Sequence, residues 1–160
     1  MKRQNYINWD SYFMGVAKLS SLRSKDPSTQ VGACIINQDK RIIGIGYNGL
    51  PMGMNDDDFP WEKEGDFVNT KYPYVVHAEA NAILNSTQDL KGATIYVTLF
   101  PCNECMKLII QSGIKEIIYE SNKDHGKDFN QASLKMMQSA GIKARQIKVD
   151  KIILEPVNED

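Results

Sequence analysis

The sequence has few of the residues that distinguish several large classes of protein. It contains 3 cysteines and 2 histidines in 160 residues, and its formal net charge is −1 at pH 7. The sequence has no run of about 18 apolar residues, so it predicts no membrane-spanning helix. The lack of a basic excess argues against a dedicated nucleic-acid binder. Three cysteines are an odd number, and their spacing does not suggest a disulfide framework.

The first residues, MKRQNYINWDSYF, also lack the apolar segment of a secretory signal peptide. We therefore expect an intracellular, cytoplasmic protein that binds neither a membrane nor a nucleic acid. A hydrophobic fraction of 42% suits a folded core. The length predicts one domain over residues 1–150, followed by a C-terminal tail over 151–160.

Hydrophobic periodicity and turn residues predict helices alternating with strands in an α/β fold. Four helices are expected, over residues 9–22, 77–85, 101–113 and 129–140. Five strands are expected, over residues 31–37, 41–48, 93–100, 115–121 and 142–149, the first two forming a hairpin. The segment 49–73, rich in glycine, proline and acidic residues, is a long loop of the kind that is often functional.

The motifs H-x-E and P-C-x-x-C place metal-binding residues where two helices are predicted to begin. Cys102 and Cys105 can share one face of a first helical turn that begins near Pro101. His77 can supply a third ligand from the other helix, and zinc accepts thiolate and imidazole together. Three protein ligands leave the fourth position open for water, which is typical of catalytic zinc.

Glu79 lies two residues after His77 and is not needed as a ligand. Its carboxylate can take a proton from the zinc-bound water and deliver it to the substrate. Each motif alone is weak, because H-x-E often occurs at solvated helix starts and C-x-x-C also forms redox pairs and structural sites. Together they match the H-x-E…P-C-x-x-C signature of zinc nucleobase deaminases. Cys34, in an apolar run, is predicted to be core.

Four longer segments, RSKDPSTQVGA, GIGYNGLPMG, TKYPYVVHAEANAI and YVTLFPCNECMKLIIQSGIKEIIY, resemble the cytidine-deaminase superfamily and, within it, the deoxycytidylate (dCMP) deaminases. The resemblance implies a three-layer α-β-α fold with a central mixed five-stranded sheet. It implies zinc-dependent hydrolysis of dCMP to dUMP and ammonia, supplying dUMP for dTMP synthesis. The matching positions make His77, Cys102 and Cys105 the ligands of one Zn²⁺ per subunit and Glu79 the proton shuttle.

The resemblance also implies contacts with the substrate. The backbone N–H of Ala78 would meet the base carbonyl, and Asn48 would contact the sugar. The alternative is that Asn48 only forms an Asn-Gly turn, which needs no ligand. Cations and hydroxyls for the phosphate are expected in the loops after the first helix and the fourth strand. The candidates are Arg23, Lys25, Ser28, Thr29 and Lys123, each of which could equally be an ordinary surface or turn residue.

Members of the resembling family are commonly hexamers, activated by dCTP with Mg²⁺ and inhibited by dTTP. The residues here that match the regulatory segment are Asn48, Gly49, Gly53 and Asp56. Some relatives hold a second, structural zinc with cysteine and histidine in this loop. Residues 49–73 contain neither type, so one zinc is expected per subunit.

Four alternatives stay open. The chain could deaminate dCTP or another cytosine nucleotide with the same fold. It could act on free cytidine, although an enzyme for a nucleoside does not need the cationic loops. It could act on a tRNA adenosine, although a net charge of −1 does not favour tRNA binding. It could be a catalytically inactive nucleotide-binding or zinc-structural protein, against which the presence of Glu79 argues.

Overall fold

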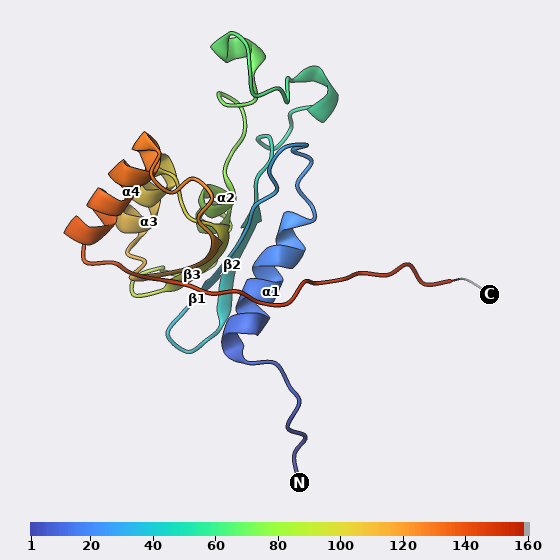
Figure 1. Ribbon diagram of the computed structural model, residues 1–160, viewed down its shortest axis with the longest axis vertical. Coiled ribbons are helices and arrows are strands. Elements are labelled where there is room, and N and C mark those ends of the chain that lie inside the picture. The colour runs from blue at the N-terminus through green and yellow to red at the C-terminus, as the bar shows by residue number, and fades with distance from the viewer. Residues whose placement is uncertain (159–160) are drawn as a thin grey trace.

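A mixed five-stranded sheet lies at the centre of the computed structural model, which describes residues 1–158 (Figure 1). The strands are β1 Gly32–Ile36, β2 Ile42–Tyr47, β3 Thr94–Leu99, β4 Glu116–Ser121 and β5 Lys143–Gln146. Their order across the sheet is β2-β1-β3-β4-β5. β1 is antiparallel to both β2 and β3, whereas β3, β4 and β5 are parallel. The predicted hairpin and the mixed sheet are therefore confirmed.

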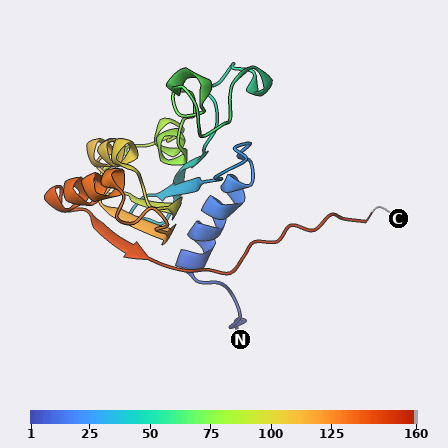
Figure 2. The same ribbon diagram turned by 45° about the horizontal axis from the view of Figure 1, so that its top comes forward.

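Four helices cover the two faces of this sheet (Figure 2). They are α1 Trp9–Ser21, α2 Ala78–Leu84, α3 Asn103–Ser112 and α4 Asp128–Ser139. Because side chains alternate along a strand, β1 contributes to both cores: Cys34 packs with Phe13 of α1, and Ile35 packs with Ala82 of α2 on the opposite face. The three-layer α-β-α prediction and the core position of Cys34 are confirmed.

α2 lies against β2 because Gly46 has no side chain. A Cβ atom on Gly46 would lie 2.4 Å from both the carbonyl oxygen of Ala78 and the backbone nitrogen of Ala82. The side-chain amide of Asn81 also donates to the carbonyl of Tyr47, at 2.8 Å. These contacts fix the N-terminal end of α2 relative to the sheet.

The boundaries of two elements differ from the predictions by more than one residue. α3 begins at Asn103, so Pro101 is not in its first turn; it is buried in the strand-to-helix turn, where its carbonyl accepts the hydroxyl of Ser133 at 2.8 Å. β5 ends at Gln146 and not at 149. Directly beyond it, the N–H of Ile147 still donates to the carbonyl of Tyr119 in β4 at 2.9 Å, and the Ile147 side chain is partly buried on the α1 side.

The predicted tail, 151–160, contains no helix or strand up to residue 158 and runs away from the body of the molecule (Figure 1). Residues 159–160 lie outside the described part of the chain. No helix within residues 1–158 has the length and apolar character needed to cross a membrane.

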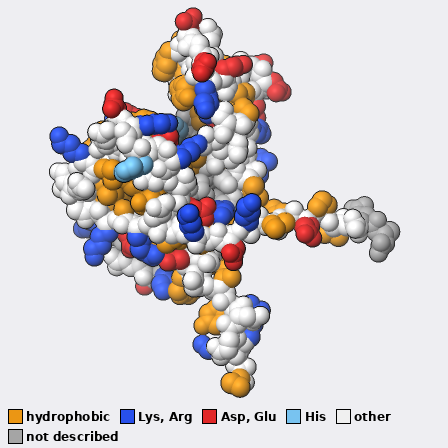
Figure 3. Space-filling view, in the orientation of Figure 1, with side chains coloured by type: hydrophobic (Ala, Val, Ile, Leu, Met, Phe, Trp, Pro, Cys, Tyr) orange, Lys and Arg blue, Asp and Glu red, His pale blue; other side chains and the backbone are white. Residues whose placement is uncertain are grey.

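The loop expected over 49–73 contains two short 3₁₀ turns, Asp56–Asp58 and Phe67–Asn69. It projects beyond the sheet at the top of Figure 1, and acidic side chains gather on this projection in Figure 3. Its return towards α2 is anchored by Thr70 and Lys71, which are both buried. The loop therefore contains regular turns and a buried anchor, which its composition did not indicate.

Candidate active site

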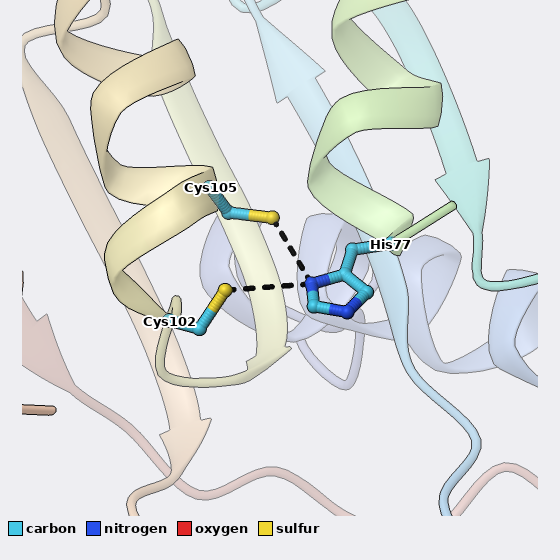
Figure 4. A group of neighbouring side chains, drawn as sticks. All are labelled: His77, Cys102 and Cys105. Carbon is cyan, nitrogen blue, oxygen red and sulfur yellow. Dashed lines mark hydrogen bonds between the residues drawn. The ribbon is translucent and has the colours of Figure 1, made fainter. Parts of the chain in front are cut away.

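His77, Cys102 and Cys105 meet where α2 and α3 begin (Figure 4). His77 is the N-cap of α2, Cys102 is the N-cap of α3 and Cys105 follows in the first turn of α3. The Nδ1 atom of His77 is 3.4 Å from the Sγ of Cys102 and 3.3 Å from the Sγ of Cys105. Among residues 1–158, this is the one group of three or more His, Cys, Asp or Glu side chains whose possible metal-ligand atoms all lie within 4.8 Å of one another.

These three side chains fit a zinc ion. Zinc–sulfur and zinc–nitrogen bonds of tetrahedral zinc imply a sulfur–nitrogen separation of about 3.6 Å, close to the observed distances. The pKa of Cys102 is lowered to about 4, chiefly because the Cys105 thiol hydrogen-bonds to it. The pKa of Cys105 is raised, chiefly because its thiol hydrogen-bonds to Cys102 and because the side chain is buried. The hydrogen bond with Cys102 raises the pKa of His77.

Glu79 lies in the first turn of α2, beside Cys105 but outside the group of three ligand side chains. Its side chain is almost fully buried, with 4% exposure. Burial raises the pKa of its carboxyl, because desolvation disfavours the charged form. A carboxyl held this way can accept and release a proton beside the metal-binding side chains.

A cavity of about 330 Å³ opens over this group. It lies among the loop before β1, the long loop before α2, and the loops that follow β3 and β4. Its lining residues are Asp26, Thr29, Val31, Asn48, Lys63, Lys71, Tyr72, Val75, His77, Ala78, Glu79, Leu99, Phe100, Cys102, Lys123, Asp124, Lys127 and Phe129. The metal-binding side chains therefore lie in the same cavity as several lysines.

The family model described as "Cytidine and deoxycytidylate deaminase zinc-binding region" matches residues 7–121 of this chain. The chain belongs to this family. The match covers His77, Cys102 and Cys105, so the zinc-binding region of the family coincides with the cluster of Figure 4. The family predicted from the sequence is thereby confirmed.

Curated members of the family are similar over nearly the whole chain. The deoxycytidylate deaminase of Homo sapiens is 52% identical over 158 residues, which cover 96% of this chain and 89% of that protein. The probable deoxycytidylate deaminase of Drosophila melanogaster is 51% identical over 152 residues, covering 91% and 75%. The similarity therefore extends beyond the zinc-binding region.

A solved structure of a family member has the same fold. The dCMP deaminase from the cyanophage S-TIM5, in complex with dCMP and dUMP, superposes with a TM-score of 0.69 at 26% identity. The match covers 85% of this chain and 94% of that chain. This agreement supports the strand order and helix layers described above.

Four of the predicted substrate contacts line the cavity. Asn48 and Ala78 lie in its wall, and Lys123 enters from the loop after β4, where its Nζ donates to the hydroxyl of Thr29 at 3.2 Å. As the first residue of α2, Ala78 has a backbone N–H without a partner inside the helix. Such a donor suits the carbonyl of a bound base.

The other three predicted contacts lie elsewhere. The guanidinium of Arg23 lies over the ring of Tyr47, 5.9 Å from its centroid. Lys25 forms an ion pair with Asp56. Ser28 is exposed and lines a separate, shallow surface pocket. None of the three lines the cavity that holds His77.

Both polar groups of the Asn48 side chain bond to the loop before β1. Its Oδ1 accepts the backbone N–H of Val31, and its Nδ2 donates to the carbonyl of Thr29, each at 2.9 Å. The side chain is buried, with 6% exposure. Asn48 therefore holds this loop in place, and one remaining N–H of its amide can serve a ligand.

The residues that match the regulatory segment of the family lie along the first part of the long loop. Gly49 pairs with Val76 through two backbone hydrogen bonds, at 3.0 and 2.8 Å. Gly53 is exposed and adopts a φ of 89°, which favours glycine. The carboxylate of Asp56 forms an ion pair with the ammonium group of Lys25. A regulatory role for these residues stays a prediction.

Sequence reasoning missed several residues of the cavity wall. Asp26 and Lys71 form a buried ion pair, Lys127 pairs with Asp124, and Lys63 comes from the long loop. No local pattern identifies Lys71, because its partner is 45 residues away in the sequence.

Proposed function

We propose that this protein hydrolytically deaminates dCMP to dUMP and ammonia, with zinc bound by His77, Cys102 and Cys105. The observation that carries the proposal is the convergence of these three side chains with the buried carboxyl of Glu79 in one cavity. The 52% identity to a curated deoxycytidylate deaminase supports dCMP as the substrate. The cyanophage relative, solved with dCMP and dUMP, supports the same choice.

The chemistry requires a nucleophilic water at neutral pH and a group that moves protons. Zinc, when bound, lowers the pKa of its water ligand to about 7. Glu79 takes one proton from the attacking water and delivers it to the ring nitrogen, and it then moves the second proton, from the hydroxyl now on carbon 4, to the amine, so that the bond from carbon 4 to the amine breaks, a carbonyl forms at carbon 4 and ammonia leaves. The N–H of Ala78 orients the base by donating to its carbonyl.

The phosphate is expected at the opposite end of the cavity from the zinc ligands, near Lys123 and the hydroxyl of Thr29. Lys127, which also lines the cavity, adds a second cation to that end. Lys71 is already neutralised by Asp26, and Lys127 shares its charge with Asp124. Lys63 and Lys123 form no ion pair among residues 1–158, and Lys123 is the better candidate because the hydroxyl of Thr29 holds its Nζ in place.

Two further features follow from the resemblance. We propose that the product dUMP is used for dTMP synthesis, and that a hexamer is activated by dCTP with Mg²⁺ and inhibited by dTTP. The acidic 3₁₀ turn Asp56–Asp58 offers carboxylates for a magnesium ion near the regulatory segment. These features stay predictions for this chain.

The function is tested by ammonia release from the purified, zinc-loaded protein offered dCMP, CMP, deoxycytidine and dCTP separately. Selective turnover of dCMP is expected. Turnover of deoxycytidine or dCTP instead would keep the zinc chemistry and reject the substrate, and no turnover of any would reject the enzyme.

The role of Glu79 is tested in the same assay with Glu79→Gln. General acid–base catalysis contributes about 10²- to 10⁴-fold, so kcat should fall by that factor while bound zinc stays stoichiometric. Glu104→Gln is the matched control, since Glu104 is exposed on the first turn of α3 and should leave kcat unchanged. Full activity in Glu79→Gln would remove Glu79 from the mechanism.

A further inference from the structure

Lys71 is a charged residue buried in the cavity wall. Its side chain is 10% exposed, and its Nζ lies 2.6 Å from Oδ2 of Asp26, whose side chain is 1% exposed. Both residues line the cavity that contains His77 and Glu79. Two charges withdrawn from water carry a desolvation penalty that often cancels their attraction, so such a pair is weak support for fold stability alone.

Asp26 organises the loop before β1. Its Oδ1 accepts the backbone N–H of Ser28 at 2.8 Å and that of Thr29 at 3.2 Å. Thr29 in turn offers its carbonyl to Asn48 and its hydroxyl to Lys123. The carboxylate of Asp26 therefore determines where the residues proposed for the sugar and phosphate lie.

Lys71 organises the long loop through its backbone. Its N–H donates to the carbonyl of Glu62, and its carbonyl accepts the N–H groups of Tyr74 and Val75, all at 3.0 Å. The chain then continues to His77 at the start of α2. Figure 1 shows the loop after α1 and the long loop at the same end of the molecule, and the ion pair joins them there.

We propose that the Asp26–Lys71 ion pair is a positioning device for the nucleotide, which holds Thr29, Asn48 and Lys123 at the end of the cavity away from the zinc ligands. The pair acts through those residues and touches none of the reacting atoms. This inference rests on the proposed function, because it assigns the pair to binding the sugar phosphate of dCMP. Its loss should therefore raise KM and leave the chemical step almost unchanged.

The test uses the double variant Asp26→Asn/Lys71→Met, because either single change would leave one buried charge unpaired. The introduced asparagine amide would keep an oxygen for the two backbone N–H groups but lose the ion pair. The matched control is Lys18→Met/Glu120→Gln, which removes a partly buried pair of 3.1 Å on the α1 side, outside this cavity. Lys71→Arg keeps the charge and serves as the rescue.

Zinc content, kcat, KM for dCMP and amide hydrogen exchange over residues 28–31 are measured on each full-length protein. The double variant should bind zinc stoichiometrically, keep kcat within about threefold, raise KM at least tenfold and exchange faster over 28–31. The control pair should keep KM within about twofold, and Lys71→Arg should recover most of the wild-type KM.

An unchanged KM in the double variant would overturn the proposal. So would a fall in kcat with constant KM, or a double variant that cannot fold, because each would give the pair a role other than nucleotide positioning. Failure of the proposed function is distinguishable, since it would appear as wild-type protein that does not deaminate dCMP. In that case unchanged exchange over 28–31 would also reject the positioning role.

Discussion

Glu79 and Cys105 are polar side chains that the proposed chemistry uses and that the fold buries at a cost to stability. Both are buried where α2 and α3 meet, and burial raises the pKa of each. A carboxyl and a thiol in such surroundings contribute less to stability than apolar side chains of the same size would. Their presence at two helix starts beside one cavity agrees with the metal binding and proton transfer proposed above.

The ligand assignment predicts that Cys105→Ala will lose zinc and activity together. Removing one of three protein ligands leaves two, which hold zinc too weakly to survive dialysis. Cys34→Ala is the matched control, because Cys34 is also buried but lies in β1 on the α1 side of the sheet. It should cost about 1 kcal/mol of stability and keep stoichiometric zinc. Zinc retained by Cys105→Ala would refute the ligand set.

Lys123→Gln should raise KM for dCMP about tenfold, since one charge-assisted hydrogen bond to phosphate contributes about 1.5 kcal/mol. The much slower turnover of deoxycytidine, which has no phosphate, should not change. Lys135→Gln on the exposed side of α4 is the control and should leave both substrates unaffected. Equal effects on dCMP and deoxycytidine would mean that Lys123 does not bind the phosphate.

At the scale of elements, the close contact between α2 and β2 sets the position of the site. Gly46→Ala should destabilise the protein by about 2 kcal/mol or more, because the new Cβ would lie 2.4 Å from the backbone of α2. Gly15→Ala is the control, since its Cβ would meet Ile152 at 3.5 Å and a helical alanine is favoured over glycine. Thermal unfolding of both variants measures the difference, and equal midpoints would show that α2 shifts without cost.

The elements and the metal-binding residues could be predicted from the sequence because their signals are local. The apolar run of β1, the glycine that ends α3 at Gly113, and the motifs around His77 and Cys105 each occupy a few adjacent residues. The ion pair of Asp26 with Lys71 could not be predicted, since it depends on two loops meeting in three dimensions. Local spacing also misplaced the start of α3, because Pro101 was predicted to be near its first position, whereas Cys102 is the N-cap and the helix begins at Asn103.

At the scale of the whole molecule, the first helix and the last strand are joined by Asp10 and Arg145. Two guanidinium nitrogens of Arg145 bond to Asp10 at 2.7 and 2.9 Å, and the hydroxyl of Tyr96 in β3 donates to the same carboxylate at 2.7 Å. These contacts connect the α1 layer to an edge strand whose own residues are all exposed. Asp10 therefore helps to hold both ends of the fold together.

The acid dependence of stability tests this connection. The Arg145 hydrogen bonds hold the pKa of Asp10 below its ordinary value of 3.8. The ionised carboxylate therefore contributes its full stabilisation to the folded protein well above pH 3.8, and this stabilisation is lost as the pH falls through the lower pKa of the folded state. Because Arg145 is about half exposed, we expect Asp10→Asn to lower the free energy of unfolding at pH 7 by about 1 kcal/mol.

The difference between Asp10→Asn and wild type should shrink as denaturant unfolding is repeated from pH 5 down to about pH 2, because the native carboxylate becomes protonated there. Asp39→Asn is the control, since the Asp39 side chain has no ion pair among residues 1–158 and should show no such trend. A constant difference across this range would mean that Asp10 stabilises the fold through hydrogen bonds that do not need its charge.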